Sequence, residues 1–203
     1  MILVRFCDPK MSTAAIVREL LEVVFPDTTS AVDLTHGMGG WWDGSAHVTV
    51  TRHDLDPARA PDGVMDFTRT SYGDRAFGVA LLDPPHIADA GADGIMGRRF
   101  GTAKNGALET LVRAGVREAW RIADKGIVVK VCDHTHGQKL VLETDWVRGA
   151  LDNRAPYEVV FQTRPRNLRD PRWKKQLSAY SNGSTFMAFR RGDQRHIKRG
   201  GSP

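Results

Sequence analysis

The sequence predicts an α/β fold, a doubly wound and mostly parallel sheet, from two kinds of alternating segment and from the acidic residues that follow one kind. Some segments carry apolar residues at helical spacing, and others are short runs of β-branched and apolar residues. Strands that alternate with helices are typical of right-handed crossovers in a parallel sheet. A carboxylate follows nearly every expected strand, and sheets of this kind bind ligands beyond the carboxyl ends of their strands.

Two helices and seven strands are expected. The segment from Ser12 to Phe25 has apolar residues near helical spacing, with Ser12 or Thr13 as its cap, and residues 107–123 form a cleaner stripe. The expected strands are, in chain order, AVDLT, HVTVTRHD, the short GVMDF, GVALLDPP, GIVVKVCD, YEVVFQTR and STFMAFRR. No clear helix separates the last two, so the final strand is expected to run antiparallel to the rest.

Length and composition predict one domain over residues 1–191, followed by a basic, flexible tail at 192–203. The chain has 203 residues, of which 41% are hydrophobic. Its two cysteines, Cys7 and Cys132, are too few for a disulfide framework and do not form a zinc-ligand pair. No apolar run is long enough to cross a membrane, and the N-terminus lacks the features of a signal peptide. We expect a cytoplasmic protein without membrane association.

The acids at the expected strand ends suggest what the sheet binds. They are Asp33, Asp54, Asp56, Asp66, Asp83 and Asp133. A glycine-rich turn with Gly37, Gly39 and Gly40 follows the first strand, but Trp42 replaces the third glycine of the dinucleotide fingerprint. Asp33 beside this turn would repel a pyrophosphate, and it would favour a ligand that carries an ammonium and a sulfonium.

The segment AVDLTHGMGG resembles the first motif of the class I S-adenosylmethionine-dependent methyltransferases. LLDPPH is similar to the fourth motif of their amino-methylating members, Asp/Asn-Pro-Pro-aromatic, and the resemblance extends over roughly residues 12–191. It implies S-adenosyl-L-methionine as the cofactor. It also implies a Rossmann-like, seven-stranded sheet with an antiparallel last strand.

The resemblance implies roles for residues at the strand ends. The glycine turn would lie under the methionine part of the cofactor, Asp54 would bind the ribose hydroxyls, and Asp66 the adenine amino group, while Phe67 would pack on the adenine. The expected cofactor-binding residues are Asp33, Thr35, Gly37, Gly39, Gly40, Asp54, Leu55, Asp66, Phe67 and Asp83. Each feature alone also fits a tight bend or a capping turn, but their occurrence in sequence order favours the cofactor.

The expected catalytic motif is Asp83, Pro84, Pro85 and His86. The lone pair of an exocyclic amine or amide is delocalised, so its nitrogen is a poor nucleophile. A fixed Asp83 carboxylate and the Pro84 carbonyl would accept its N–H bonds and direct the lone pair toward a methyl group. Two prolines would keep the loop rigid, because in-line transfer tolerates little misplacement. His86 stands where the family has an aromatic residue stacked on a flipped base; whether it stacks or carries a proton is left open.

Carbon methylation and a metal site are not expected. No Pro-Cys follows the fourth strand to supply a nucleophile, and Cys132 is expected to be buried as a small apolar residue. The segment CDHTH (Cys132 to His136) lacks further ligands for a tetrahedral site, and is interpreted as a polar loop above the pocket.

Basic and aromatic residues are concentrated in two segments that are expected beside the pocket. The segment after the fourth expected strand carries Arg98, Arg99 and Lys104. The segment before the last expected strand carries Arg164, Arg166, Arg169, Arg172, Trp173, Lys174, Lys175 and Tyr180. With a formal net charge of +5, the chain suits a polyanionic partner. Phosphate neutralisation and base stacking need this mixture of residues, although a charge run often forms only a solvated face.

The sequence therefore predicts an amino methyltransferase of a nucleic-acid base, preferably adenine N6 in DNA, with the base flipped out of a duplex. The chain has no room for a separate recognition domain, so its sequence choice would be short or degenerate unless a second copy assists in a homodimer. Such compactness resembles DNA adenine methyltransferases of phages and other mobile elements. Three alternatives stay open: an RNA base (guanine N2 or adenine N6) methyltransferase, a protein-glutamine or small-amine N-methyltransferase, and a catalytically silent nucleic-acid-binding module.

Overall fold

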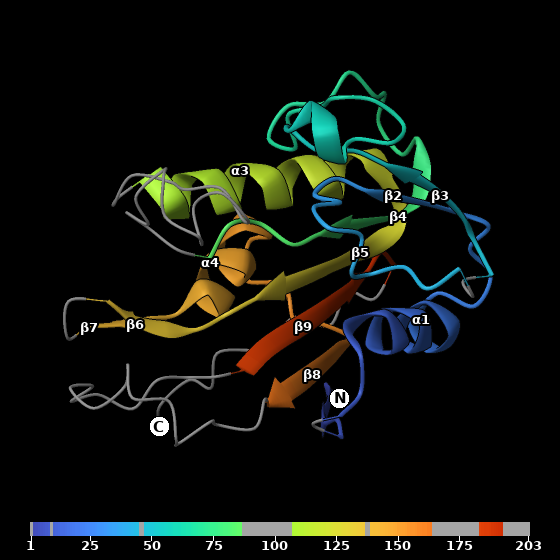
Figure 1. The fold of residues 1–203 in the computed structure, drawn as a ribbon. Coiled ribbons are helices and arrows are strands. Elements are labelled where there is room, and N and C mark those ends of the chain that lie inside the picture. Colours follow the sequence, from blue (N-terminus) through green and yellow to red (C-terminus); the bar gives the residue numbers. More distant parts are fainter. Residues whose placement is uncertain are drawn as a thin grey trace.

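A seven-stranded mixed sheet with helices on both faces forms the structure (Figure 1). The computed structural model describes residues 2–8, 10–44, 47–86, 107–136, 139–163 and 183–192. The strands of the sheet are β1 (Leu3–Phe6), β2 (Ser30–Asp33), β3 (Thr49–Arg52), β4 (Phe77–Leu82), β5 (Ala123–Val131), β8 (Glu158–Thr163) and β9 (Gly183–Arg190). The other elements are α1 (Thr13–Val24), the short 3-10 helix η1 (Pro57–Arg59), α3 (Ala107–Ile122), α4 (Glu143–Ala150), and a two-stranded ladder of β6 (His134–His136) and β7 (Lys139–Val141).

The sheet has the strand order β1-β8-β9-β5-β4-β2-β3. All neighbouring strands are parallel except β9, which is antiparallel to both β5 and β8. This confirms the expected antiparallel last strand. The carboxyl ends of β2, β3, β4 and β5 therefore lie at one edge of the sheet. Asp33 at the end of β2 is paired in register with Arg52 of β3 and Leu81 of β4.

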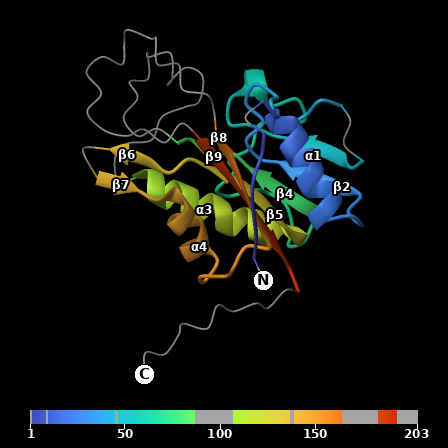
Figure 2. The same ribbon diagram turned by 90° about the horizontal axis from the view of Figure 1, so that it is seen from below.

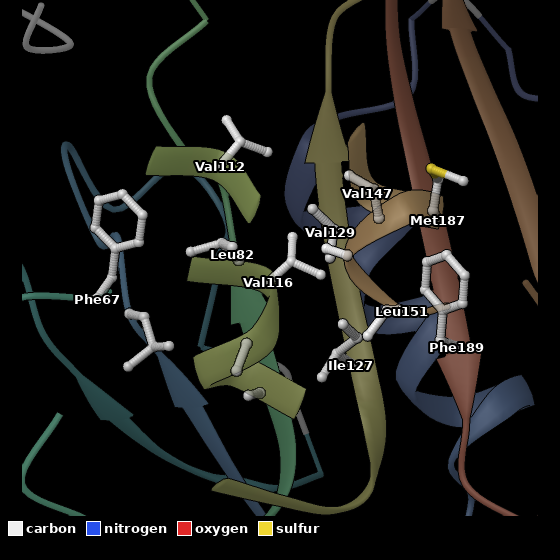
Figure 3. Close-up of a cluster of buried hydrophobic side chains, with 14 of the residues drawn as sticks. Phe67, Leu82, Val112, Val116, Ile127, Val129, Val147, Leu151, Met187 and Phe189 are labelled. Carbon is white, nitrogen blue, oxygen red and sulfur yellow. The ribbon is translucent and has the colours of Figure 1, made fainter. Parts of the chain in front are cut away.

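Helices cover both faces of the sheet, α1 on one face and α3 with α4 on the other (Figures 1 and 2). A cluster of buried apolar side chains lies between the sheet and the helices on each face. Because side chains alternate along a strand, Val79 and Leu81 of β4 pack in the cluster that includes α1, whereas Ala80 and Leu82 pack in the cluster of α3 and α4. Figure 3 shows the second cluster, in which Val112 and Val116 of α3 pack on the face of the sheet near Leu82 of β4 and Val129 of β5. The structure is thus doubly wound, as predicted.

The two expected helices form close to their predicted bounds. The Ser12 hydroxyl accepts a hydrogen bond from the backbone N–H of Ala15 at 3.1 Å, so Ser12 is the N-cap of α1. The apolar stripes of α1 and α3 are buried against the sheet. No helix in the described ranges is long and apolar enough to span a membrane. The predicted tail lies outside these ranges from residue 193 onward.

The seven strands are not the seven that were expected. GVMDF was predicted as a strand, but it contributes only an isolated bridge between Val64 and Asp54. The seventh strand is instead β1, which pairs with β8 at the edge of the sheet. Its exposed Leu3, Val4 and Phe6 give it no alternation of buried and exposed residues, so sequence pattern did not indicate it. The helix α4 and the β6–β7 ladder were also not predicted.

Candidate active site

A glycine-rich loop after β2 connects the predicted motifs. Gly37 and Gly39 have φ angles of +56° and +75°, a left-handed region that favours glycine. The loop returns over the strand ends: the Thr35 hydroxyl accepts a hydrogen bond from the backbone N–H of Asp83 at 2.7 Å, and the N–H of Gly37 donates to the Asp54 carboxylate at 2.8 Å. The structure thus brings together predicted site residues from three strand ends.

The Asp33 carboxylate is bound within the chain. It is 2% exposed and accepts hydrogen bonds from the Trp42 indole at 2.7 Å and the backbone N–H of Thr35 at 3.1 Å. The His36 ring lies 3.3 Å from the same carboxylate. Trp42, the residue that replaces the third fingerprint glycine, therefore ties the end of the loop to β2. Asp33 is thus hydrogen-bonded within the chain rather than open at the turn, and its expected effect on the charge of a bound ligand stays a prediction.

The Asp54 carboxylate, by contrast, is held by the backbone. It accepts hydrogen bonds from the N–H groups of Gly37 at 2.8 Å and Asp56 at 2.9 Å, and its side chain is partly exposed. The neighbouring Leu55 is 64% exposed. A fixed carboxylate beside an exposed apolar side chain can bind a ligand that has hydroxyl donors and a flat apolar part.

A buried histidine positions Asp54. His53 is 2% exposed, and its ring nitrogens lie 2.6 Å from the Gly63 carbonyl and 2.6 Å from the Tyr72 hydroxyl. These contacts hold the segment after β3 against residues 63 and 72. Sequence reasoning missed His53 and Tyr72, since neither belongs to a motif.

The two residues expected to contact adenine are placed differently from each other. Asp66 is exposed, and its carboxylate accepts hydrogen bonds from the backbone N–H and hydroxyl of Thr68 at 2.8 and 2.6 Å. Phe67 is 7% exposed and packs in the core near Val112 and Leu82 (Figure 3). The ring packs so closely against α3 that a Cβ added to Gly115 would lie only 2.5 Å from it. Most of the Phe67 ring is thus part of the core, and both adenine contacts stay predictions.

Asp83 directly follows β4 and has three side-chain partners. One carboxylate oxygen, Oδ2, accepts from Lys130 Nζ at 2.6 Å and from Trp41 Nε1 at 3.2 Å. The other, Oδ1, lies 2.8 Å from His86 Nε2. Burial by itself raises the pKa of Asp83, but the hydrogen bond from His86 and the charge of Lys130 outweigh it and lower the pKa to about 2. Asp83 is therefore ionised at neutral pH, with a cation on each side.

His86 bridges two carboxylates. Its Nε2 lies 2.8 Å from Asp83, and its Nδ1 lies 2.9 Å from Oε2 of Glu143. Burial lowers the pKa of His86, but the hydrogen bonds to Asp83 and Glu143 outweigh this effect and raise it to about 9. At neutral pH both ring nitrogens then donate, so the ring has no free position for another proton. This geometry favours a fixed cation over a proton carrier. Pro84, buried, and Pro85, half-buried, join Asp83 to His86.

Glu143, the first residue of α4, is fully buried behind His86. Its Oε2 also accepts from the backbone N–H of Cys132 at 3.0 Å, and its Oε1 lies 3.4 Å from Nδ1 of His134. Burial raises the pKa of Glu143, but the two histidines lower it, and Glu143 in turn raises the pKa of His134. Within the described ranges, no cluster of His, Cys, Asp and Glu side chains is suited to hold a metal ion.

No protein-family model and no curated protein matches the sequence. Solved structures do match. A geranyl diphosphate methyltransferase in complex with S-adenosylmethionine superposes with a TM-score of 0.56 and 15% identity, over 88% of this chain and 85% of that one. Magnesium protoporphyrin IX methyltransferase from Synechocystis PCC 6803, with bound S-adenosylhomocysteine, has a TM-score of 0.56 and 11% identity, over 88% and 81% of the two chains. The chain has a Rossmann-like methyltransferase fold.

Proteins with this methyltransferase fold do not all carry out the same reaction. A (4+2)-cyclase also matches, with a TM-score of 0.55 and 11% identity, over 91% of this chain and 85% of that one. The fold therefore does not decide the activity, which has to be argued from the site.

Three residues of the site lie outside the motifs that the sequence indicated. They are Trp41, Lys130 and Glu143, which contact Asp83 or His86. His134, which contacts Glu143, lies in the segment CDHTH, but that segment was expected to be a loop and its residues His134–His136 form β6. The Trp-Trp pair directly after the glycine turn was the one signal that could have been used. The predicted nucleic-acid-binding residues, in contrast, all lie outside the described part of this methyltransferase fold: Arg98, Arg99, Lys104, Arg164, Arg166, Arg169, Arg172, Trp173, Lys174, Lys175 and Tyr180.

Replacing Glu143 by glutamine is expected to lower the pKa of His86, because the imidazolium loses one of its two carboxylate partners. The wild-type ring should titrate near pH 9 when its NMR signals are followed over pH. This pKa is raised above that of a histidine in the unfolded chain. Protonated His86 therefore stabilises the folded state fully below about pH 6.5, and this stabilisation is lost as the pH rises toward 9. Asp145→Asn, an exposed change on the same helix turn, is the control and should leave the midpoint in place. An unchanged midpoint in Glu143→Gln would contradict the assigned pairing.

Proposed function

We propose that the chain is an S-adenosylmethionine-dependent methyltransferase that acts on the amino nitrogen of a nucleic-acid base, with adenine N6 in DNA preferred. One observation carries the amino-methylation part of this proposal: Asp83 stands at the end of β4, ionised and partly accessible, and is joined to the glycine-rich loop through Thr35. A carboxylate in this place can accept an N–H bond of a substrate beside a ligand that the loop holds.

The residues at the ends of β2 and β3 fit the cofactor that the resemblance implies. The glycine loop presents its backbone closely, Asp54 offers a carboxylate for ribose hydroxyls, and exposed Leu55 offers an apolar surface for adenine. The matched structures with bound S-adenosylmethionine and S-adenosylhomocysteine support the same choice. When bound there, the cofactor supplies an electrophilic methyl group.

Asp83 is suited to orient an amino group. Two of its hydrogen bonds fall on Oδ2 and one falls on Oδ1, and a carboxylate oxygen has two lone pairs, so Oδ1 keeps an acceptor position. An N–H donated to this position holds the amino nitrogen with its lone pair directed away from Asp83. His86 contacts the same oxygen, Oδ1, and keeps Asp83 in place; as an imidazolium, it is not the base of the reaction.

The choice of nucleic acid as substrate is supported by the sequence of two segments, residues 87–106 and 164–182. Both are expected to follow strand ends at the site and to carry basic and aromatic residues, which suit phosphates and bases. The small-molecule names of the matched methyltransferases belong to those proteins, which are only 11–15% identical to this chain.

Transfer of a labelled methyl group tests the proposal. The full chain is incubated with methyl-labelled cofactor and with DNA, RNA or a protein extract, and the labelled product is digested to nucleosides and analysed by mass. Label in N6-methyl-2′-deoxyadenosine from DNA is the expected result. Label that survives nucleases and is lost to protease would favour a glutamine substrate, and cofactor binding without transfer to any polymer would overturn the proposal.

Asp54→Asn is expected to weaken cofactor binding about tenfold, because a carboxylate that accepts ligand hydroxyls typically contributes about 1.5–3 kcal/mol. Isothermal titration with S-adenosylhomocysteine measures the affinity. Asp56→Asn is the matched control: Asp56 caps η1, accepts from Ala58 and is exposed, so its replacement should leave the affinity unchanged. Equal affinities for wild type and Asp54→Asn would remove Asp54 from the cofactor site.

A further inference from the structure

Lys130 is a charged residue in the sheet that no motif explains. It precedes the last residue of β5, and its side chain is 11% exposed. Its neighbours Val129 and Val131 face the cluster of α3 and α4, so Lys130 points to the opposite face, the one on which Trp41 packs. There its ammonium meets Asp83 at 2.6 Å.

The Lys130–Asp83 pair costs desolvation, and replacing such a pair with apolar residues is often neutral or stabilising. A pair of this kind at a site edge is therefore weak evidence for a role in stability. Both partners keep some accessible surface, 11% for the Lys130 side chain and 23% for that of Asp83. The pair thus combines one hydrogen-bond donor and one acceptor on two side chains that are not completely buried.

We propose that Lys130 is a specificity-determining residue, whose ammonium donates a hydrogen bond to the acceptor atom that adjoins the target amino group. This inference rests on the proposed function and deepens it: the substrate is an amino group on a carbon that also carries a nitrogen or oxygen acceptor. Asp83 accepts from the amino N–H, and Lys130 donates to the neighbouring atom.

This pairing has a known chemical counterpart. The carboxamides of Asn and Gln recognise adenine with one acceptor and one donor, directed to N6 and N7. The Lys130–Asp83 pair offers the same combination. Adenine can donate its N6–H to Asp83 and accept from Lys130 at either N1 or N7. Cytosine, with its N4–H donor and N3 acceptor, and a carboxamide, with its N–H donor and carbonyl acceptor, fit the pair equally well.

Alkyl amines do not fit. A protonated amine carries only donors, and it would bring a second cation next to Lys130. The carboxylates beside the pair are also matched by basic groups, since Asp83 contacts Lys130 and protonated His86, and Glu143 contacts His86 and His134. The Lys130–Asp83 pair therefore offers no net negative charge to attract a cationic substrate. Of the alternatives left open by the sequence, a small amine becomes the least compatible with the site.

Deaza analogues of adenine test the inference, because each lacks one acceptor atom. Pools of random-sequence DNA are synthesised with deoxyadenosine, 1-deazadeoxyadenosine or 7-deazadeoxyadenosine, and methyl transfer is measured with wild type, Lys130→Met and Lys130→Arg. Wild type should methylate deoxyadenosine about tenfold or more faster than one of the analogues, since a bidentate contact is worth about 1–3 kcal/mol of discrimination. Lys130→Met should lose this difference, because its rate of methyl transfer should fall on the deoxyadenosine pool and not on that analogue pool. Lys130→Arg should retain the difference.

Affinity for S-adenosylhomocysteine is measured in each variant and should stay within about twofold of wild type, which shows that the cofactor site is intact. If Lys130→Met slows all three pools equally, or keeps the discrimination of wild type, Lys130 is not a specificity residue although the proposed function stands. If wild type transfers no methyl group to any pool, the proposed function and the inference both fail.

Discussion

Replacing Asp83 by asparagine is expected to lower methyl transfer at least about a hundredfold, while cofactor affinity changes by no more than about twofold. Asparagine offers one acceptor oxygen where aspartate offers two, and its amide N–H groups would face Lys130 or His86, which are themselves donors. The variant thus loses the oriented acceptor for the substrate N–H. It keeps the backbone N–H of residue 83, which Thr35 binds, so the loop that holds the cofactor stays attached.

Transfer to DNA and binding of S-adenosylhomocysteine are measured separately for this variant. Asp74→Asn is a suitable control, because Asp74 is an exposed carboxylate that pairs with Arg121 before the amino end of β4. The control should keep full activity. Transfer at the wild-type rate by a folded Asp83→Asn enzyme would show that the fourth-strand carboxylate does not orient the substrate.

Gly126→Ala should be the most destabilising single substitution of those considered, at about 3 kcal/mol or more. Gly126 lies in β5 with a φ of +154°, where pairing with β4 shifts register between Phe77 and Val79. A Cβ at this position would clash with the backbone carbonyl of Phe189 in β9 and lie 2.7 Å from the ring of Phe25. A backbone atom in the centre of a sheet cannot move aside as a flexible side chain can, so the cost falls on the pairing of β5 with β9.

Urea unfolding measures this loss, and Gly73→Ala provides the comparison. A Cβ on Gly73 meets no atom within 4 Å, so its free energy of unfolding should change by less than about 1 kcal/mol. A similarly small change for Gly126→Ala would mean that β5 and β9 can separate locally at little cost, contrary to their close pairing.

Periodicity along the chain was enough to predict the helices α1 and α3 and the strands of the sheet centre, because each buries a continuous apolar stripe or run. It failed for elements whose burial is partial. The edge strand β1 leaves Phe6 75% exposed, and α4 has only eight residues with no side-chain cap. The GVMDF segment has strand-like composition, but Phe67 turns into the core under Gly115 and only Val64 pairs.

The site shows the same division. Sequence alone determined that Asp33, Asp54 and Asp83 stand at or just after strand ends, though not that Asp66 follows no strand. It also determined that two prolines and a histidine follow Asp83, since chain order and turn chemistry decide these features. Only the tertiary structure decided how those acids are charged and paired. Lys130 lies 47 residues from Asp83, and Glu143 lies 57 residues from His86. Their contacts exist because β4 packs beside β5 and α4 begins under the site, and a local pattern holds no information on such distant partners.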